Sequence, residues 1–404
     1  MHGVTAWRRP AGVGLVAAGL ALVLALTLTP AAGPDVGAFL WCVRCGDFGL
    51  SDFIANVLLF VPLAAGLMVC GVAARRIVAA AFLLATAIEL AQLAIPGRES
   101  TLGDVLAAAL GAALVVLGRR AWPARRSVRA GLLAAAAALS LVTLAGLALR
   151  PSLPPTVWYG QWTAALGQFE WYRGRLLRVT LGGAPLADGR FPDSRPVRAG
   201  LAAGEPLAVR AVAGPRTRRL APLFSIADSA YREILVVGAD RDDLVLRVRT
   251  VAAGLGLAQP DIRWRGALAA ARPGDTLAIG MRRNGRGYCL EVNGTERCGL
   301  GVTAGRAWAL LRDVPELPAA AQAALDCVCV ALLMLAVGLV TTRNAAGLVT
   351  ALGALAGMAA LPPALGLLPT PALQLAASAA GFVAGRLAPG AGERAHAPVD
   401  LGVG

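Results

Sequence analysis

The chain has 404 residues, of which 57% are hydrophobic and only 15% are charged, with a mean hydropathy of +0.65 and a formal net charge of +14. This composition excludes a single soluble domain and indicates a membrane protein with room for two or three domains. The sequence holds no lysine, and its two histidines, His2 and His396, lie in the terminal tails. We therefore expect no lysine Schiff base, and no triad or metal site built on histidine.

Eight apolar stretches are predicted to be membrane-spanning helices. They cover residues 11–29, 52–71, 77–95, 102–118, 130–149, 319–341, 345–361 and 370–387. If the spans alternate in direction, the arginines of the short loops fall almost all on one side, which predicts that this side is cytoplasmic. Both termini are then cytoplasmic. As an alternative, the first span is a signal peptide that is cleaved near residues 31–33.

Four polar or charged side chains near the ends of the second and third spans belong to a candidate site that also includes the start of the fourth. Asp52 and Asn56 share one helical face, as do Glu89 and Gln92. A charge at the centre of a bilayer costs about 2.5–3.5 kcal/mol on insertion scales, so such residues call for an explanation. The assumed topology brings these span ends together on the outer side.

Two further residues complete this candidate polar pocket. Arg98 follows the third span, and Asp104 lies in the first turn of the fourth. We expect Arg98 to pair with Glu89, Asp52 or Asp104 and so to limit the cost of burying an acid. The pocket either binds a lipid or glycan headgroup, works as an acid–base site with Glu89 as the catalytic candidate, or only holds three helices together.

The polar pattern of residues 35–120 resembles the VanZ-like family, a bacterial membrane family named from a teicoplanin resistance locus. The resemblance rests on Asp52-x3-Asn56, Phe60-x-Pro62-x3-Gly66, Glu89-x2-Gln92, Arg98 and Asp104-x6-Gly111. The family often has asparagine four residues after the aspartate of the fourth span, where this chain has Ala108. The resemblance implies a bacterial inner or plasma membrane, the cell envelope and a link to glycopeptide resistance.

Residues 151–317 differ from the rest of the chain and are predicted to form an extracytoplasmic β domain. Turn residues separate short alternating stretches, and arginines outnumber acidic residues. The predicted strands are 206–213, 220–227, 233–238, 243–250, 276–283, 287–292 and 295–301. In 244–250 the alternation of Leu244, Leu246 and Val248 with Val245, Arg247 and Arg249 predicts one buried face.

Two cysteine pairs are predicted to form disulfides in an oxidising outer compartment. Asn293-Gly294 is a strong signal for a two-residue type I′ turn. That turn places Cys289 opposite Cys298 in a non-hydrogen-bonded pair, at a Cα separation of ~4.5 Å that a disulfide admits. Two free thiols are the alternative. Cys42-x-x-Cys45 is interpreted as a local disulfide, with a redox-active pair or a zinc site as alternatives.

The strand rhythm from Leu223 to Arg249, with the later Asn293-Gly294 hairpin, resembles the concanavalin A-like or laminin-G jelly roll. This resemblance implies binding of glycans or proteins, sometimes with calcium. The aspartates that could supply oxygen ligands to calcium are Asp228, Asp240, Asp242 and Asp243, although solvated turns are the alternative. The E-x-D-x-x-E set of the hydrolytic branch is not present. We expect no other cofactor.

The predicted architecture is a helical membrane bundle with an inserted all-β sandwich. Its parts are a helical domain of five spans (1–150), the β-sandwich (151–317), three further spans (318–388) and a cytoplasmic tail (389–404). We expect a protein that binds membrane lipids and an envelope glycan, lipid headgroup or peptidoglycan precursor, and no nucleic acid. The alternative is a membrane enzyme acting on a lipid-linked envelope substrate; an enzyme is the less favoured of the two. A transporter ranks last because no inverted repeat is visible.

Overall fold

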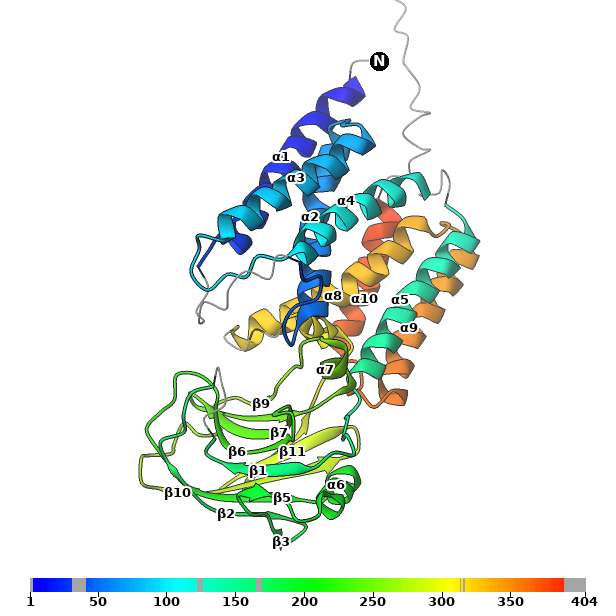
Figure 1. The fold of residues 1–404 in the computed structure, drawn as a ribbon. Helices are drawn as coiled ribbons and strands as arrows, with labels where there is room; N and C mark the ends of the chain where they lie inside the picture. The colour runs from blue at the N-terminus through cyan, green and yellow to red at the C-terminus, as the bar shows by residue number, and fades with distance from the viewer. Residues whose placement is uncertain are drawn as a thin grey trace, which may run out of the picture. The chain divides into compact units, whose positions relative to one another are not determined.

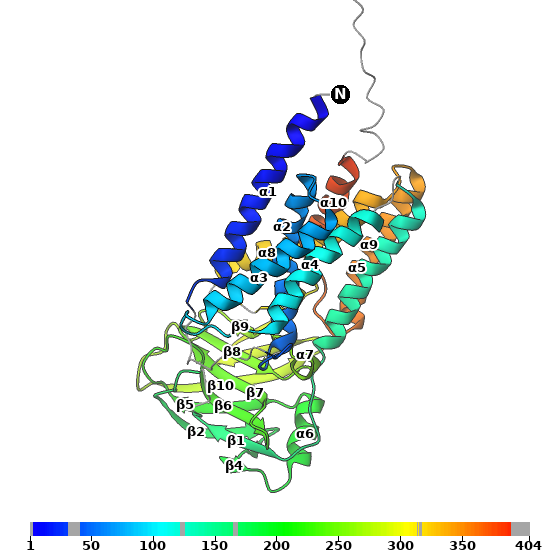
Figure 2. The ribbon, with the colours of Figure 1, turned by 45° about the horizontal axis from the view of Figure 1, so that its top comes forward.

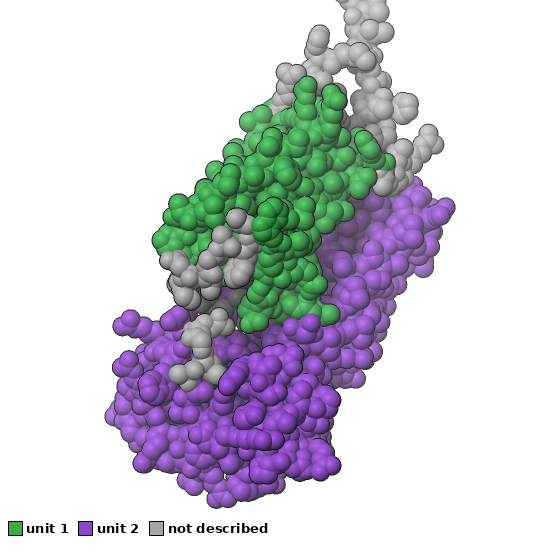
Figure 3. Space-filling model, in the orientation of Figure 1, with its two compact units in different colours: residues 1–122, 255–258 green, residues 123–254, 259–404 purple. Residues whose placement is uncertain are grey.

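The computed structural model describes residues 3–30, 41–121, 126–164, 169–312, 314 and 317–388 (Figure 1). His2, His396 and the predicted cytoplasmic tail lie outside the described residues. The chain divides into two compact units, shown in Figure 3. Unit 1 comprises residues 1–122 and 255–258, and unit 2 comprises residues 123–254 and 259–404. The fifth predicted span thus belongs to the same unit as the β domain.

Unit 1 is a bundle of four helices, which Figure 2 shows lying along one another. They are α1 (Gly3–Thr27), α2 (Gly49–Val69), α3 (Ala74–Gln92) and α4 (Leu102–Ala121). Helix α2 packs against α1 and α4, and α3 packs against α4. Small residues allow these close approaches: a Cβ added at Gly111 of α4 would collide with the carbonyl oxygen of Val57 in α2. The core between the helices is rich in alanine and valine.

The helices of unit 2 follow the same packing rule. They are α5 (Val128–Ala148), α8 (Ala319–Val340), α9 (Ala345–Ala364) and α10 (Ala372–Leu387), with the 3₁₀ helix η1 (Gly305–Leu310) before α8. Helix α8 packs along α10, and α5 packs along α9. Gly381 of α10 meets the backbone of Ala331 in α8 without room for a side chain. Close backbone approach at glycine therefore joins these helices too.

Helices stand at all eight positions where spans are predicted, and six helices in the described part of the chain are long and apolar enough to cross a membrane. Those six are α1, α2, α4, α5, α8 and α9. Helix α3 carries Arg75, Arg76 and Glu89 within its 19 residues, and α10 has only 16 residues. Helix α9 continues through Pro362 and Pro363, which stand in its last turn. The chain therefore has a helical membrane part.

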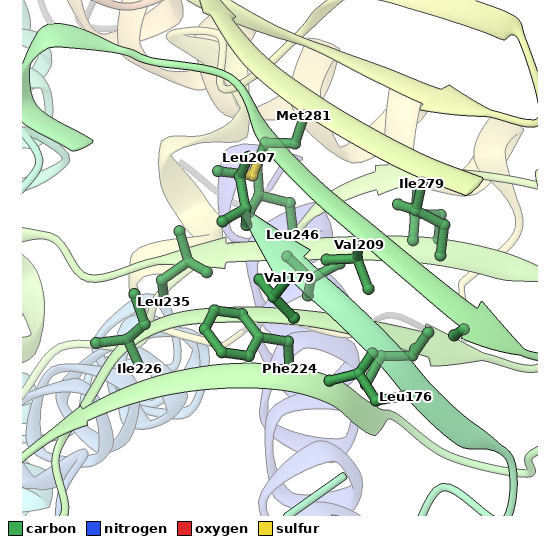
Figure 4. Packing of buried hydrophobic residues seen from close by; sticks show 14 of the residues in the cluster. Leu176, Val179, Leu207, Val209, Phe224, Ile226, Leu235, Leu246, Ile279 and Met281 are labelled. Carbon is green, nitrogen blue, oxygen red and sulfur yellow. The ribbon is translucent and has the colours of Figure 1, made fainter. Parts of the chain in front are cut away.

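The rest of unit 2 is a β domain of two six-stranded antiparallel sheets. The first has the order β4-β1-β6-β7-β8-β9 and the second β12-β11-β10-β5-β2-β3. The strands are β1 (Trp158–Trp162), β2 (Arg175–Leu181), β3 (Ala184–Pro185), β4 (Gly189–Arg190), β5 (Leu207–Val212), β6 (Ala221–Asp228), β7 (Glu233–Asp240), β8 (Asp243–Val248), β9 (Ile262–Trp264), β10 (Thr276–Asn284), β11 (Gly287–Val292) and β12 (Thr295–Leu300), with the short helices α6 (Ser194–Ala203) and α7 (Val251–Leu255) between them. Side chains of both sheets meet in one core, where Figure 4 shows Phe224 and Ile226 across from Val179 and Leu207.

All seven predicted strands are present, together with five others that the sequence patterns do not predict. The longest of these is β2, whose buried residues Leu176, Val179 and Leu181 are spaced three and two apart. A register shift between Leu176 and Arg178 in its pairing with β5 accounts for this spacing. A β-bulge of this kind breaks the period of two on which strand recognition depends.

Strand β8 differs from the expectation of one buried face. Leu244, Val245 and Leu246 are all fully buried. Val245 stands opposite Arg263 of β9 and shares its face with Arg247. Ion pairs between these arginines and neighbouring acids cover the second face, so the apolar residues beneath them are buried as well.

Candidate functional site

The predicted polar pocket is built by the N-terminal ends of α2 and α4 and the C-terminal end of α3. The side-chain amide of Asn56 in α2 donates a hydrogen bond of 2.7 Å to Oδ1 of Asp104 in α4. Both side chains are partly buried. The amide is a neutral donor, and its hydrogen bond replaces part of the hydration that the carboxylate gives up at a helix interface. It therefore offsets part of the free-energy cost of burying the acid.

Glu89 is 7% exposed and accepts a hydrogen bond of 2.7 Å at Oε2 from the backbone N–H of Thr101. Thr101 precedes α4, and its hydroxyl accepts the backbone N–H of Asp104 at 3.2 Å. Ser100 donates its hydroxyl to the backbone carbonyl of Glu89 at 2.9 Å. A carboxylate from α3 therefore caps the N-terminus of α4, where a negative charge is favoured by the helix dipole.

Ser100 and Thr101 are not among the site residues predicted from sequence, although the sequence holds a signal for them. Thr101-x-x-Asp104 has the spacing of a helix N-cap box. In that pattern the acidic residue usually bonds back to the cap. Here Asp104 turns to Asn56 instead, and Glu89 supplies the missing acceptor from a different helix. Only the tertiary structure places the Glu89 carboxylate within hydrogen-bonding distance of the N-terminus of α4.

Arg98 does not pair with the acids of the pocket, contrary to the expectation from sequence. Its guanidinium donates to the carbonyl oxygens of Leu26 at 2.7 Å and Thr29 at 2.8 Å, at the C-terminal end of α1. No ion pair of Arg98 occurs within the described parts of the chain. The last carbonyls of a helix have no partners inside it, and a cation there also suits the helix dipole.

Gln92 also turns toward α1. Its side-chain amide donates to the carbonyl of Thr27 at 2.9 Å, while its Oε1 is buried and accepts no hydrogen bond from the described residues. Gln92 as a whole is 6% exposed. The six predicted residues thus form two groups, one of acids and Asn56 and one of Arg98 and Gln92 on the end of α1.

Asp52 is the exposed member of the acidic group. Asp104 lies within electrostatic range of both Asp52 and Glu89. The three carboxylates do not come close enough together to form a metal-ligand cluster, since the one such group in the described residues is Cys289, Glu296 and Cys298. The arrangement presents the oxygens of three carboxyl groups as hydrogen-bond acceptors.

A segment of unit 1 that comes from far along the sequence lies beside this group. The backbone N–H groups of Leu50 and Ser51 both donate to the carbonyl of Gly256, at 3.0 and 3.1 Å. The hydroxyl of Ser51 accepts the N–H of Ala258 at 2.7 Å, and Arg44 donates to the carbonyl of Leu255. No local pattern predicts these contacts, because more than 200 residues separate the partners.

Both predicted cysteine pairs are bonded in the structure, Cys42 to Cys45 and Cys289 to Cys298. Asn293 and Gly294 have φ values of +50° and +83°, as a type I′ turn requires. The turn sets the predicted register, with Val292 opposite Thr295. Beyond it the register shifts, so that Cys289 stands opposite two residues of β12. The three other cysteines, Cys70, Cys327 and Cys329, are free.

Each of the four calcium candidates is bonded to an arginine. The pairs are Asp228 with Arg232 at 2.7 Å, Asp240 and Asp243 with Arg263 at 2.8 and 3.1 Å, and Asp242 with Arg216. Burial raises the pKa of Asp228, but hydrogen bonds from the Arg232 side chain and backbone outweigh it and hold the pKa below its usual value. Calcium at these residues would have to displace arginines, and it stays a prediction.

Comparison with known proteins bears on the first helices only. Residues 21–122 match the family model described as VanZ/LLP1, which covers α2, α3, α4 and the C-terminal end of α1. All six residues of the predicted pocket lie inside that match. Neither the curated proteins nor the solved structures contain a match to the chain.

Proposed function

We propose that the protein binds a cell-envelope ligand through the acidic group formed by Asp52, Asn56, Glu89 and Asp104, and that this group faces the outer leaflet of a bacterial membrane. The ligand is a headgroup rich in hydrogen-bond donors, of which a primary ammonium is the simplest. One observation carries the proposal: Asp104 lies within range of two other carboxylates, and Arg98, the nearest cation in the sequence, is engaged on α1. A donor-rich ligand would add hydrogen bonds and positive charge beside these carboxylates.

Two features of the group support binding in preference to acid–base catalysis. The Glu89 carboxylate is fixed by the N–H of Thr101, and that of Asp104 is fixed by Asn56. Groups held this way can position a ligand without exchanging a proton. Asp52 is exposed, so a headgroup can reach the group from outside.

The proposal is tested with two lipids that differ only in their donors. The full chain in detergent micelles is offered phosphatidylethanolamine, whose ammonium donates hydrogen bonds, and phosphatidylcholine, whose trimethylated ammonium does not. Native mass spectrometry counts the lipids retained. We expect preferential retention of phosphatidylethanolamine, and equal retention of the two lipids would refute the proposal.

Three variants locate the binding. Asp104→Asn and Glu89→Gln keep the accepted hydrogen bonds but remove charge, so we expect each to reduce the preference for phosphatidylethanolamine. Asp47→Asn removes an exposed acid of the same unit and should leave the preference unchanged. If Glu89→Gln abolished turnover of a lipid-linked substrate but left lipid retention intact, the enzyme alternative would replace this proposal.

The VanZ/LLP1 match supports an envelope role and, through the family resemblance, a link to glycopeptide resistance. That link is measured by the susceptibility of a bacterial host to teicoplanin when it expresses the wild-type chain or Asp104→Asn. We expect the wild type to lower susceptibility more than the variant does. Equal susceptibility of the two strains would remove the acidic group from any resistance function.

The β domain supplies a second binding surface in this proposal, on the outer face of β2 and β5. Arg178 stands directly opposite Arg210 in the sheet register, and Arg175 lies near them on β2. All three are exposed and form no ion pair with the described residues. Like charges opposite each other destabilise a sheet, so an anionic envelope polymer is the occupant that fits.

This surface is tested with dextran sulfate and neutral dextran as probes of the full chain. We expect salt-sensitive binding of dextran sulfate alone, weakened in the double variant Arg178→Gln/Arg210→Gln. Arg190→Gln, on the other sheet, is the matched control. Equal binding by the double variant and the control would remove this surface from the proposal.

A further inference from the structure

Unit 2 contains a pocket of about 290 Å³ that is separate from the surfaces described above. Its walls come from β9 and the residues that flank it, from β12 and the loop that follows it, from η1, and from the first two turns of α8. Ligand pockets in proteins range from about 300 to 1,000 Å³, so this one suits a headgroup and not a whole lipid.

Arginines dominate the pocket wall. Four line it, Arg263, Arg265, Arg297 and Arg306, against two acids, Asp261 and Asp326. Both acids are already engaged by protein donors. Asp261 accepts from Arg247 at 2.7 Å, and Asp326 accepts from the indole N–H of Trp308 at 2.7 Å.

The four arginines are not equivalent. Arg263 is neutralised by Asp240 and Asp243. Arg265 donates to the backbone carbonyl of Leu317 at 2.8 Å, which leaves its charge uncompensated among the described residues. Arg297 is exposed on the edge strand β12, and its side chain forms no ion pair with the described part of the chain. The pocket therefore carries excess positive charge.

Arg306 lies over the ring of Trp308, with its guanidinium carbon 5.0 Å from the ring centroid. Stacking of this kind holds the guanidinium plane in a fixed direction. A planar guanidinium with fixed orientation favours bidentate bonding to phosphate or carboxylate oxygens. Three arginines from three different elements thus surround one volume.

The pocket also lies at the start of a candidate membrane span. Ala319, Gln322 and Asp326 of α8 form part of its wall, and α8 is among the six apolar helices. At about 1.5 Å per residue, Ala319 and Asp326 are separated by about 10 Å along the helix. The first turns of a spanning helix lie at the level of the lipid headgroups.

We propose that this pocket, lined by Arg265, Arg297 and Arg306, binds a phosphate group, carried either by a membrane lipid or by a soluble phosphate ester. The charge excess selects an anion, and the three guanidiniums match the several oxygens of a phosphate. None of its residues belongs to the acidic group of unit 1, so the inference does not depend on the proposed function.

The experiment uses the full chain and two sources of the same chemistry. In one arm, native mass spectrometry compares retention of phosphatidylglycerol with that of phosphatidylcholine. In the other, glycerol phosphate competes for the retained phosphatidylglycerol. Preferential retention of phosphatidylglycerol without competition assigns the site to lipid, whereas competition assigns it to a soluble phosphate ester as well.

Variants decide whether the pocket is responsible. A charge-assisted hydrogen bond to phosphate is strong enough that Arg297→Gln or Arg265→Gln should weaken the affinity roughly 10-fold or more. Arg297→Lys retains the charge and should restore part of the loss. Arg272→Gln, at an exposed loop position outside the pocket, is the control. The proposal is overturned if the pocket variants retain phosphatidylglycerol as well as the wild type, or if Arg272→Gln loses as much.

Discussion

The carboxylates of unit 1 and those of the β domain are satisfied by different partners. In unit 1, Asp104 and Glu89 accept hydrogen bonds from neutral donors, a side-chain amide and a backbone N–H. In the β domain, Arg247 is bonded to both Glu233 and Asp261, and its side chain is only 18% exposed. Burial lowers the pKa of this guanidinium, but the two acids raise it more, so its pKa lies above the usual value.

The choice between neutral donors and arginines follows from the cost of burying a charge in each environment. An arginine buried between spanning helices would add a second costly charge to the first, whereas an amide or a peptide N–H adds none. In a β domain surrounded by water, the ends of a buried ion pair network can reach solvent, and several partners share the cost. The acids of unit 1 are therefore satisfied by neutral donors, whereas those of the β domain are satisfied by arginines.

The largest expected effect comes from breaking the buried network of the β domain. Arg247→Met leaves Glu233 and Asp261 without a shared cation and should reduce the free energy of unfolding by about 3–5 kcal/mol. Hydrogen exchange of the β8 amides in the full chain measures this loss. Arg195→Met removes an exposed pair with Asp193 and should have a much smaller effect on stability, because solvent screens the two charges. A similar cost for both variants would show that burial does not distinguish the two pairs.

A smaller effect is expected from the close helix contacts of unit 1. Gly111→Leu places a side chain against the backbone of Val57 and should destabilise the bundle by about 1–3 kcal/mol. Thiol labelling during heating measures the stability of each unit separately. Cys70, at the C-terminal end of α2, reports on unit 1, and Cys327, in α8, reports on unit 2.

In that experiment only the labelling of Cys70 should shift to lower temperature. Gly118→Leu is the matched control on the same helix, since a Cβ there meets nothing within 4 Å. An equal shift for both cysteines, or for both glycine variants, would argue against local packing as the cause.

The smallest effect concerns pH and the ion pair of Asp228, whose partner Arg232 is half exposed. The folded state holds the pKa of Asp228 below its unfolded value of about 3.9. This carboxylate therefore contributes stability above about pH 4, and the contribution is lost as the pH falls further, through the folded-state pKa.

Asp228→Asn should make the unfolding midpoint of the β domain less sensitive to pH between about 5 and 3, because the titrating group is removed. Asp275→Asn, at an exposed turn, controls for the loss of any one carboxylate. If Asp228→Asn and the wild type lost the same stability on acidification, the ion pair with Arg232 would not be the source.

Much of the architecture follows from local patterns in the sequence. The long apolar stretches place the helices, and the alternation of residues 206–301 places seven strands with the correct hairpin at Asn293-Gly294. Strand β2 is not predicted by such patterns, because its bulge interrupts the two-residue alternation of buried and exposed side chains. Hydrophobic patterns predict an element correctly where buried residues recur at a regular spacing along the sequence. They fail where one extra residue shifts that spacing, as in a β-bulge.

The polar residues of the candidate site are visible in the sequence because charges in apolar helices stand out, but their partners are not. Arg98 binds carbonyls at the end of α1, Glu89 caps α4, and Ser51 meets Ala258. Hydropathy reports the cost of burying a polar group, whereas the choice of its partner depends on which backbone ends lie within hydrogen-bonding distance. Only the tertiary structure decides that, because the competing donors and acceptors come from segments far apart in the chain.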